Sequence, residues 1–226
     1  MKTITSLLSS TLFLAYAGVA SASLTGSVAF KGAAPKAEPI KMDADPKCKQ
    51  LSGGKAVDND IVVNGGKLAD VFVYVKNAPA GTYAPKGAVT LDQKACMYHP
   101  KMLGLMVKQD LEIVNSDPTL HNIHAFSKKG EFNVGMPTQG QKLKKQFKKA
   151  EVLVPIKCDV HPWMHAWAGV VEHPFFGVSN DKGDFTIENL PDGDYEVVAV
   201  HGKLGEQTAK VKVAGGAGTA AFTFGN

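Results

Sequence analysis

Apolar and polar residues alternate in short runs along most of the chain, and Gly, Pro, Asn and Asp interrupt these runs repeatedly. A period of two is typical of half-buried β-strands, and the interrupting residues favour turns. The clearest run is VFVYV at 71–75, and a single short helix is predicted near 118–123. This spacing predicts an all-β fold, either a sandwich or a barrel. Further strands are predicted at 24–30, 88–91, 111–114, 151–156, 168–171, 184–188, 195–200, 208–213 and 221–224.

Residues 1–22 have the features of a cleaved export signal. Lys2 supplies a positive start, residues 7–19 are mostly apolar, and Ala20-Ser21-Ala22 is a small-residue cleavage site. We therefore expect a signal peptide at 1–22, cleavage near Ala22, and a periplasmic or secreted protein. The alternative is an N-terminal amphipathic helix. No later run approaches the ~20 apolar residues of a membrane-spanning helix, so we expect no membrane span.

Lysine supplies all 25 basic residues, against 21 acidic ones, and arginine is absent. Nucleic-acid readers rely on arginine for bidentate and stacking contacts, so the net charge of +4 does not predict nucleic-acid binding. The densest basic run comprises Lys142, Lys144, Lys145, Lys148 and Lys149. This run would attract an acidic redox partner over long distances, or else it is an ordinary solvated face of a hairpin.

The seven residues 158–164, CDVHPWM, bring a thiol, an imidazole and a thioether into one short loop. Mg²⁺ and Ca²⁺ prefer oxygen ligands, whereas one Cys, two His and a weak axial Met are the ligands of blue-copper sites. The loop supplies Cys158, His161 and Met164. His121, which follows the turn-like sequence NSDPT at 115–119, is the best candidate for the second His. Zinc would also fit the Cys and two His, but the thioether favours copper.

Export also bears on the three cysteines, because an oxidising compartment allows one disulfide and leaves one thiol. Cys48 has no His at ligand spacing. Cys96 has a partial echo of the metal loop in CMYHPKM at 96–102, but only Cys158 follows a clear strand and has an upstream His motif. We therefore predict a Cys48–Cys96 disulfide and a free Cys158. Closing that loop of about 49 residues would stabilise the fold by roughly 4 kcal/mol.

The loop resembles that of the cupredoxins, in particular the amicyanin type, whose ligands are spaced C-x-x-H-P-F-M. The sequence His121-Asn122-Ile123 is similar to the H-N-V motif around the first His of that family. The resemblance covers about residues 86–172 and implies a cupredoxin-type Greek-key sandwich that holds one mononuclear type 1 copper ion. Trp163 replaces the Phe of the motif, and Asp159 stands where many cupredoxins have a Ser or Thr that bonds the Asn side chain. Asp159 would have to take over that bond.

A second resemblance concerns both ends of the chain. The sequences DKGDF at 181–185 and LPDGDY at 190–195 resemble the strand–turn repeats of carboxypeptidase-regulatory-like domains, which are small transthyretin-like β-sandwiches. The sequences GSV at 26–28 and ADVFV at 69–73 are similar to the opening strands of such domains. The resemblance implies that residues 23–85 and 173–226 build this sandwich and that a cupredoxin domain at 86–172 is inserted in it. A separate module starting near residue 176, or ordinary hairpins of one sandwich, are the alternatives.

The whole chain resembles the exported methylamine-utilisation-like proteins, in which the two kinds of domain share one chain. We therefore expect an exported copper protein that carries single electrons and is not an enzyme, since four protein ligands leave no position for a substrate. Its partner would be a redox protein such as a cytochrome, a dehydrogenase or an oxidase. Pro162, Trp163 and Trp167 would form the docking patch, unless Trp167 belongs to the core.

Two other functions remain as alternatives. A copper chaperone or storage protein would use the same four ligands. An adhesion or carbohydrate-binding module would be centred on the second sandwich. His165 directly follows Met164 and would compete with it as a ligand. A second metal site built from His99, His124, His165 or His173 is a further alternative. Because His99, His173 and His201 lie beside Pro or Gly, they are otherwise expected at the surface or in turns.

Overall fold

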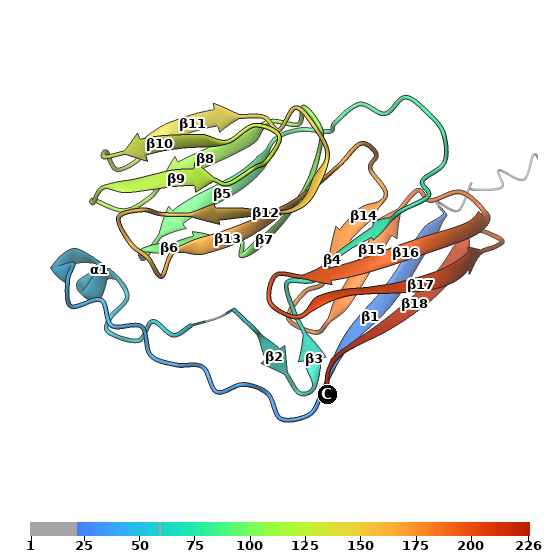
Figure 1. Cartoon of the computed structure of the whole chain (residues 1–226), viewed down its shortest axis with the longest axis horizontal. Helices are drawn as coiled ribbons and strands as arrows, with labels where there is room; N and C mark the ends of the chain where they lie inside the picture. Colours follow the sequence, from blue (N-terminus) through green and yellow to red (C-terminus); the bar gives the residue numbers. More distant parts are fainter. Residues whose placement is uncertain (1–21, 59) are drawn as a thin grey trace, which may run out of the picture.

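The computed structural model describes residues 22–58 and 60–226, and most of this chain forms β-strands (Figure 1). The strands are grouped into four sheets, which pair into two sandwiches. The expectation of an all-β sandwich protein is therefore confirmed. The predicted signal peptide lies, apart from Ala22, outside the described residues. Among the residues that the structure describes, no helix is long and apolar enough to cross a membrane.

The middle of the chain forms the sandwich at the upper left of Figure 1, called here the central sandwich. One of its sheets has the order β10-β9-β12-β13-β7 and the other the order β11-β8-β5-β6. Inward-facing residues such as Leu111 and Ile113 alternate with half-buried ones and fill the core between the sheets. The strands are β5 Val89–Lys94, β6 Met97–His99, β7 Met102–Met106, β8 Leu111–Asn115, β9 His121–Ala125, β10 Phe132–Met136, β11 Lys142–Lys145, β12 Glu151–Lys157 and β13 His165–Val171.

The two ends of the chain together form the other sandwich, called here the terminal sandwich. One sheet has the order β15-β1-β3-β2, with β18 paired to the other edge of β1, and the second has the order β14-β4-β16-β17. β1 and β18 run parallel over their full lengths, so the first and last strands lie side by side (Figure 1). The strands are β1 Ser23–Lys31, β2 Val63–Asn64, β3 Lys67–Leu68, β4 Phe72–Val75, β14 Phe176–Val178, β15 Asp184–Glu188, β16 Gly193–His201, β17 Gly205–Val213 and β18 Ala217–Gly225.

Strand β4 is buried on both faces and joins the two sandwiches. Val73 and Val75 point into the terminal core, whereas Phe72 belongs to a separate cluster with Met102 and Val171 of the central sandwich. This explains why the run at 71–75 is apolar without interruption: a strand covered on both sides has no solvent-facing positions.

Residues 32–58 and 60–62, called here the connecting segment, leave β1, cross to the central sandwich and return to β2 (Figure 1). The segment contains the short helix α1, Pro46–Leu51, whose N-cap is Asp45. Cys48 of α1 and Met42 are buried in the central core. Cys48 forms a disulfide with Cys96, and Cys158 is free, as predicted from the sequence.

Three sequence-based expectations differ from the structure. The helix predicted near 118–123 is wrong, because His121–Ala125 is strand β9, paired with β10 and β12. Residues 23–85 supply strands β1 to β4, as expected, but this range also contains the connecting segment, which packs α1 on the central sandwich and was not expected. His201 is not a surface residue, since its exposed fraction is 2%.

Candidate metal centre

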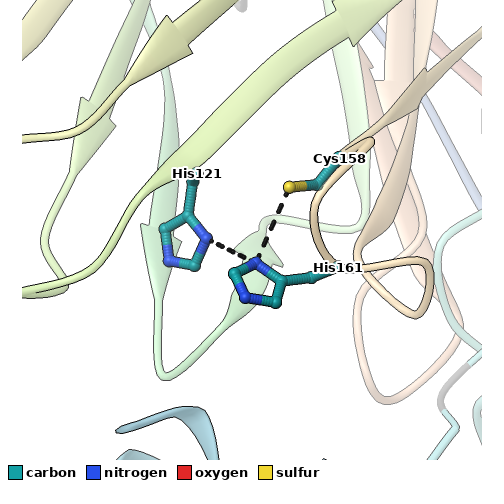
Figure 2. A group of neighbouring side chains, drawn as sticks. All are labelled: His121, Cys158 and His161. Atoms are coloured by element: carbon teal, nitrogen blue, oxygen red, sulfur yellow. Dashed lines mark hydrogen bonds between the residues drawn. The ribbon is translucent and has the colours of Figure 1, made fainter. Parts of the chain in front are cut away.

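Three of the four predicted ligands, His121, Cys158 and His161, come together in one buried cluster (Figure 2). One potential ligand atom from each residue lies within 4.8 Å of the others. Their exposed fractions are 0%, 3% and 2%, respectively. Cys158 and His161 share one loop, but His121 is 40 residues from His161 in the chain, so it is the fold that brings His121 to the loop.

The loop 158–164 is the tip of the hairpin formed by β12 and β13. Lys157 and His165 are the last paired residues, and the loop closes on itself above them. The backbone N–H of Cys158 donates to the carbonyl of Met164 (3.1 Å), and the N–H of Met164 donates to the carbonyl of His161 (2.9 Å). These bonds hold three of the predicted ligands in a fixed spatial order.

His121 is the first residue of β9, which pairs antiparallel with β12. Lys157 lies opposite His124, so continuing this register brings Asp159 opposite Asn122. The Asn122 side chain uses both its groups there: Oδ1 accepts from the N–H of Asp159 (2.6 Å), and Nδ2 donates to Oδ2 of Asp159 (3.0 Å). The expectation that Asp159 serves as the acceptor for Asn122 is confirmed.

The imidazoles of His121 and His161 face each other through their Nδ1 atoms, which are 3.0 Å apart. The Nδ1 of His161 also lies 3.8 Å from Sγ of Cys158 (Figure 2). The opposite nitrogens are occupied: Nε2 of His121 contacts Asp117 Oδ2 and Nε2 of His161 contacts Asp45 Oδ2, each at 2.9 Å.

Because ionised carboxylates only accept hydrogen bonds, both Nε2 atoms must donate. The other nitrogen of each imidazole, Nδ1, is therefore the one available to a ligand, and it is directed toward the thiol. In the metal-free protein the two adjacent Nδ1 atoms share one proton, since one must donate and the other accept. A metal ion would replace that proton.

Electrostatics favours the ligand form of Cys158. Burial raises the pKa of the Cys158 thiol, but the adjacent imidazoles of His121 and His161 outweigh it and bring the pKa to about 6. Burial lowers the pKa of His121, but Asp117 and Cys158 raise it to about 9. Burial also lowers the pKa of His161, whereas Cys158 and Asp45 raise it above its usual range. The thiolate, which is the form that binds metals, is therefore accessible near neutral pH.

Met164, the fourth predicted ligand, lies in the same core cluster as Cys158 and has an exposed fraction of 0%. Its backbone closes the loop, as described above. The assignment of its sulfur as a ligand stays a prediction.

His165 lies outside the cluster of His121, Cys158 and His161 and points to the connecting segment. Its Nε2 hydrogen-bonds with Asp60 and lies 3.0 Å from Nζ of Lys101. Asp58, Asp60 and His165 form a group with metal-binding residue types, but the ammonium groups of Lys101 and Lys203 lie 3.2 Å and 2.9 Å from Asp60. These lysines already neutralise the carboxylate.

The other residues considered from the sequence have separate environments. His124 contacts Asp159 and Glu131 through its two nitrogens. Trp163 packs against the ring of His161, with ring centroids 5.2 Å apart, whereas Trp167 packs in the junction of the two sandwiches. Trp167 is half-buried and lines a surface pocket together with Pro162, so it belongs neither wholly to the core nor wholly to the surface, and the docking patch stays a prediction.

Two residues of the centre, Asp45 and Asp117, were not identified from the sequence as functional. Asp117 lies four residues before His121 in a sequence typical of a turn, and it accepts hydrogen bonds from the backbone N–H groups of Ala95 and Cys96. Asp45 precedes Pro46, which is a helix-start signal, and it is 116 residues from His161. The Asp-Pro pair would have predicted α1, but no local signal would have placed that helix at the centre.

The donor set fits a borderline or soft metal ion. One thiolate and two imidazoles converge in a buried position, and Mg²⁺ or Ca²⁺ would find no oxygen-rich shell there. His121, Cys158 and His161 would hold the ion.

Comparison with known proteins gives only partial similarities. No family model matches the sequence, and no curated protein matches it. Among solved structures, a Cu(I) form of an amicyanin mutant is 20% identical over 43% of this chain and 97% of its own, with a TM-score of 0.33.

A Cu-containing nitrite reductase from Thermus scotoductus is 21% identical over 42% of this chain, which is 25% of its own length, with a TM-score of 0.33. A purple cupredoxin from Nitrosopumilus maritimus is 20% identical over 38% of this chain and 99% of its own, with a TM-score of 0.31. At these TM-scores the similarity by itself establishes neither a family nor a function for this chain.

Proposed function

We propose that this chain is an exported type 1 copper protein that passes single electrons between redox partners. His121, Cys158 and His161 would hold one copper ion, with Met164 as a weak axial ligand. The observation that carries this proposal is the buried cluster in which a thiolate and two inward-facing Nδ1 atoms converge. Thiolate, imidazole and a weak thioether are the ligand types of blue-copper centres.

The chain would contribute rigidity to this function, while copper would supply a one-electron couple. The hairpin bonds of the loop, the Asn122–Asp159 pair and the two carboxylates restrict movement of the ligands. A site that changes little between Cu(I) and Cu(II) needs little reorganisation, which favours fast electron transfer. The proposed role is that of a carrier and not of an enzyme, because the ligand atoms are enclosed by protein.

The partner would be a redox protein such as a cytochrome, a dehydrogenase or an oxidase. Two exposed apolar side chains, Leu120 (44%) and Val160 (46%), directly precede the ligands His121 and His161 in the chain. They offer a protein partner apolar contacts near the centre. The Cys48–Cys96 disulfide supports the proposed export to the periplasm or outside the cell, since oxidising compartments retain disulfides.

Copper loading of the purified protein tests the proposal. We expect Cu(II) to produce an intense thiolate-to-copper absorption band and voltammetry to give a reversible one-electron couple. Cys158→Ser should abolish the band entirely, because the thiolate generates it. Met164→Leu should keep the band and raise the reduction potential, because loss of the weak donor disfavours Cu(II).

Met102→Leu is the matched control, since Met102 is equally buried but lies in the junction of the sandwiches. It should change neither the band nor the potential. Absence of both the band and a reversible couple in the wild-type protein would overturn the proposal. Rapid transfer of Cu(I) to an acceptor without a reversible couple would instead indicate a copper chaperone or storage protein.

A further inference from the structure

The Cys48–Cys96 disulfide is in contact with the candidate metal centre. Sγ of Cys48 lies 3.5 Å from Nε2 of His161. The carbonyl of Cys96 accepts a hydrogen bond from Nε1 of Trp163 (3.0 Å), and the Trp163 ring packs on His161.

The same two cysteines also hold the carboxylates that contact the imidazoles. The backbone N–H of Cys48 donates to Asp45 Oδ1 (3.0 Å), and that of Cys96 donates to Asp117 Oδ2 (2.7 Å). Each carboxylate has one further backbone donor, Lys47 for Asp45 and Ala95 for Asp117, at 2.9 Å and 2.8 Å. The disulfide therefore joins two short segments, each of which presents one fixed carboxylate to one ligand histidine.

We propose, on the basis of the copper function above, that Asp45 and Asp117 are positioning residues and that the disulfide holds both of them on the centre. Each carboxylate fixes the Nε2–H tautomer of its histidine and leaves Nδ1 for the metal. A carboxylate in this position also makes the imidazole a stronger donor, and loss of such a partner typically costs 10–100-fold in metal affinity. Asp45 belongs to the connecting segment, so a segment outside the central sandwich completes the centre.

The oxygen atoms of the two carboxylates are used differently, and this gives a sharp test. Asp45 accepts both backbone donors on Oδ1 and uses Oδ2 for His161 alone. In Asp45→Asn, the amide oxygen takes the place of Oδ1, because only an oxygen can accept the two backbone hydrogen bonds. The NH₂ group then takes the place of Oδ2 and faces His161. The amide then donates to Nε2, which forces the proton of His161 onto Nδ1.

Asp117 has the opposite arrangement, because Oδ2 accepts from both Cys96 and His121, while Oδ1 accepts from Ala95 alone. Asp117→Asn therefore keeps an acceptor on His121 and loses only the negative charge and one backbone bond. The tautomer of His121 should survive this substitution, whereas the charge that favours Cu(II) over Cu(I) is removed.

The first experiment is ¹⁵N NMR of the imidazoles in the metal-free protein, which needs no bound copper. We expect a proton on Nε2 of both histidines in the wild type, in addition to the one shared between the two Nδ1 atoms. His161 should lose its Nε2 proton in Asp45→Asn, and His121 should keep its own in Asp117→Asn. Asp43→Asn is the matched control, because Asp43 lies on the same segment but pairs with the exposed Lys49. Unchanged His161 tautomers in Asp45→Asn would overturn the assignment of Asp45.

The second experiment is titration with Cu(II) and voltammetry of the same variants. We expect Asp45→Asn and a Cys48→Ala, Cys96→Ala double variant to bind Cu(II) 10–100-fold more weakly, and Asp117→Asn to shift the reduction potential upward. Wild-type affinity in the double variant would overturn the role of the disulfide, and an unchanged potential in Asp117→Asn would overturn that of Asp117. Wild-type protein that binds no Cu(II) would refute the copper function but not the tautomer assignment.

Discussion

At the scale of single residues, the pKa values of two buried histidines are shifted in opposite directions. His121 lies beside Asp117 and Cys158, which raise its pKa to about 9. Burial lowers the pKa of His201 to about 4; Asp60 opposes this shift and Lys203 adds to it. The Nδ1 of His201 accepts a hydrogen bond from the backbone N–H of Lys203 (3.1 Å), which requires the neutral imidazole. The fold thus stabilises the charged form of one histidine and the neutral form of the other.

His201 should weaken the protein in mild acid. Below pH 6.5 His201 is protonated in the unfolded chain, whereas in the folded chain it stays neutral until the pH falls to about 4. The free energy of unfolding therefore decreases as the pH falls from 6.5 to about 4. The loss is about 3 kcal/mol at most. In His201→Asn, whose Oδ1 replaces Nδ1 as the acceptor, this part of the loss should disappear. Urea unfolding of both proteins at pH 7 and pH 4.5 measures it.

The difference between the two proteins isolates His201, because the titrating groups of the metal centre are common to both. His99→Asn is the control, since His99 is exposed. Equal pH dependence in His201→Asn and wild type would refute the prediction.

The sequence allowed three of the residues at the centre to be predicted, and the reason is local. Cys158 and His161 belong to one loop, and His121 follows a recognisable turn, so their residue types and spacing are visible in one dimension. Asp45 and Asp117 could not be predicted as partners of the histidines, because their role depends on distances between separate segments. His201 was expected on the surface or in a turn because of its glycine neighbour. A turn does follow it, but its ring is buried beside Phe224 of β18, a contact between separate strands that the local sequence does not indicate.

At the scale of elements, the junction of the sandwiches depends on glycines in two central strands. A Cβ atom added at Gly169 of β13 would lie 2.5 Å from the ring of Phe72. One added at Gly104 of β7 would lie 2.6 Å from the ring of Phe176. The two strands are paired directly at these glycines, so together they form a shallow recess for the aromatic rings of the terminal sandwich.

Gly169→Ala should therefore destabilise the protein by about 1–3 kcal/mol, because the fully buried Phe72 ring has to move. Gly135→Ala in β10 should change the free energy of unfolding by no more than about 0.5 kcal/mol, since no atom lies within 4 Å of a Cβ there. Chemical denaturation compares the two. A combined Gly169→Ala, Phe72→Leu protein should recover part of the loss, and an additive loss would contradict the steric explanation.

Most strands were predictable from the sequence because alternating burial is recorded in each strand separately. The predicted run at 111–114 corresponds to β8, where residues alternate between buried and half-buried. The helix α1 was missed because its six residues are too few to show a helical period. The segment 118–123 was predicted as a helix, but pairing with both neighbouring strands makes His121–Ala125 a strand.

At the scale of the whole molecule, the disulfide closes a covalent ring that passes through both sandwiches. Residues 48–96 run from α1, on the central sandwich, through β2, β3 and β4 of the terminal sandwich and back to β5. A cut after Cys48 leaves the preceding chain attached through Cys96, whereas a cut before Cys48 does not.

A protease site inserted between Gly53 and Gly54, which are both exposed, should test this ring. After cleavage we expect one band on a denaturing gel without reductant and two bands with reductant. The matched protein carries the same site between Ala34 and Pro35, which are also exposed, and mass spectrometry should show its short N-terminal fragment released under both conditions. Two bands from the first protein without reductant would show that the ring is open.

The pairing of β1 with β15 and β18 also determines the order in which the chain becomes complete during synthesis. β1 is made first of the described strands, but β15 and β18, which pair with most of its length, follow all strands of the central sandwich, and β18 is the last strand made. All strands of the central sandwich emerge in between, so that sandwich can assemble while β1 still has an unpaired edge. An exposed edge of this kind invites pairing with other chains until it is covered. The nascent protein therefore carries its greatest risk of aggregation up to the moment when its last nine residues of strand, Ala217–Gly225, are released.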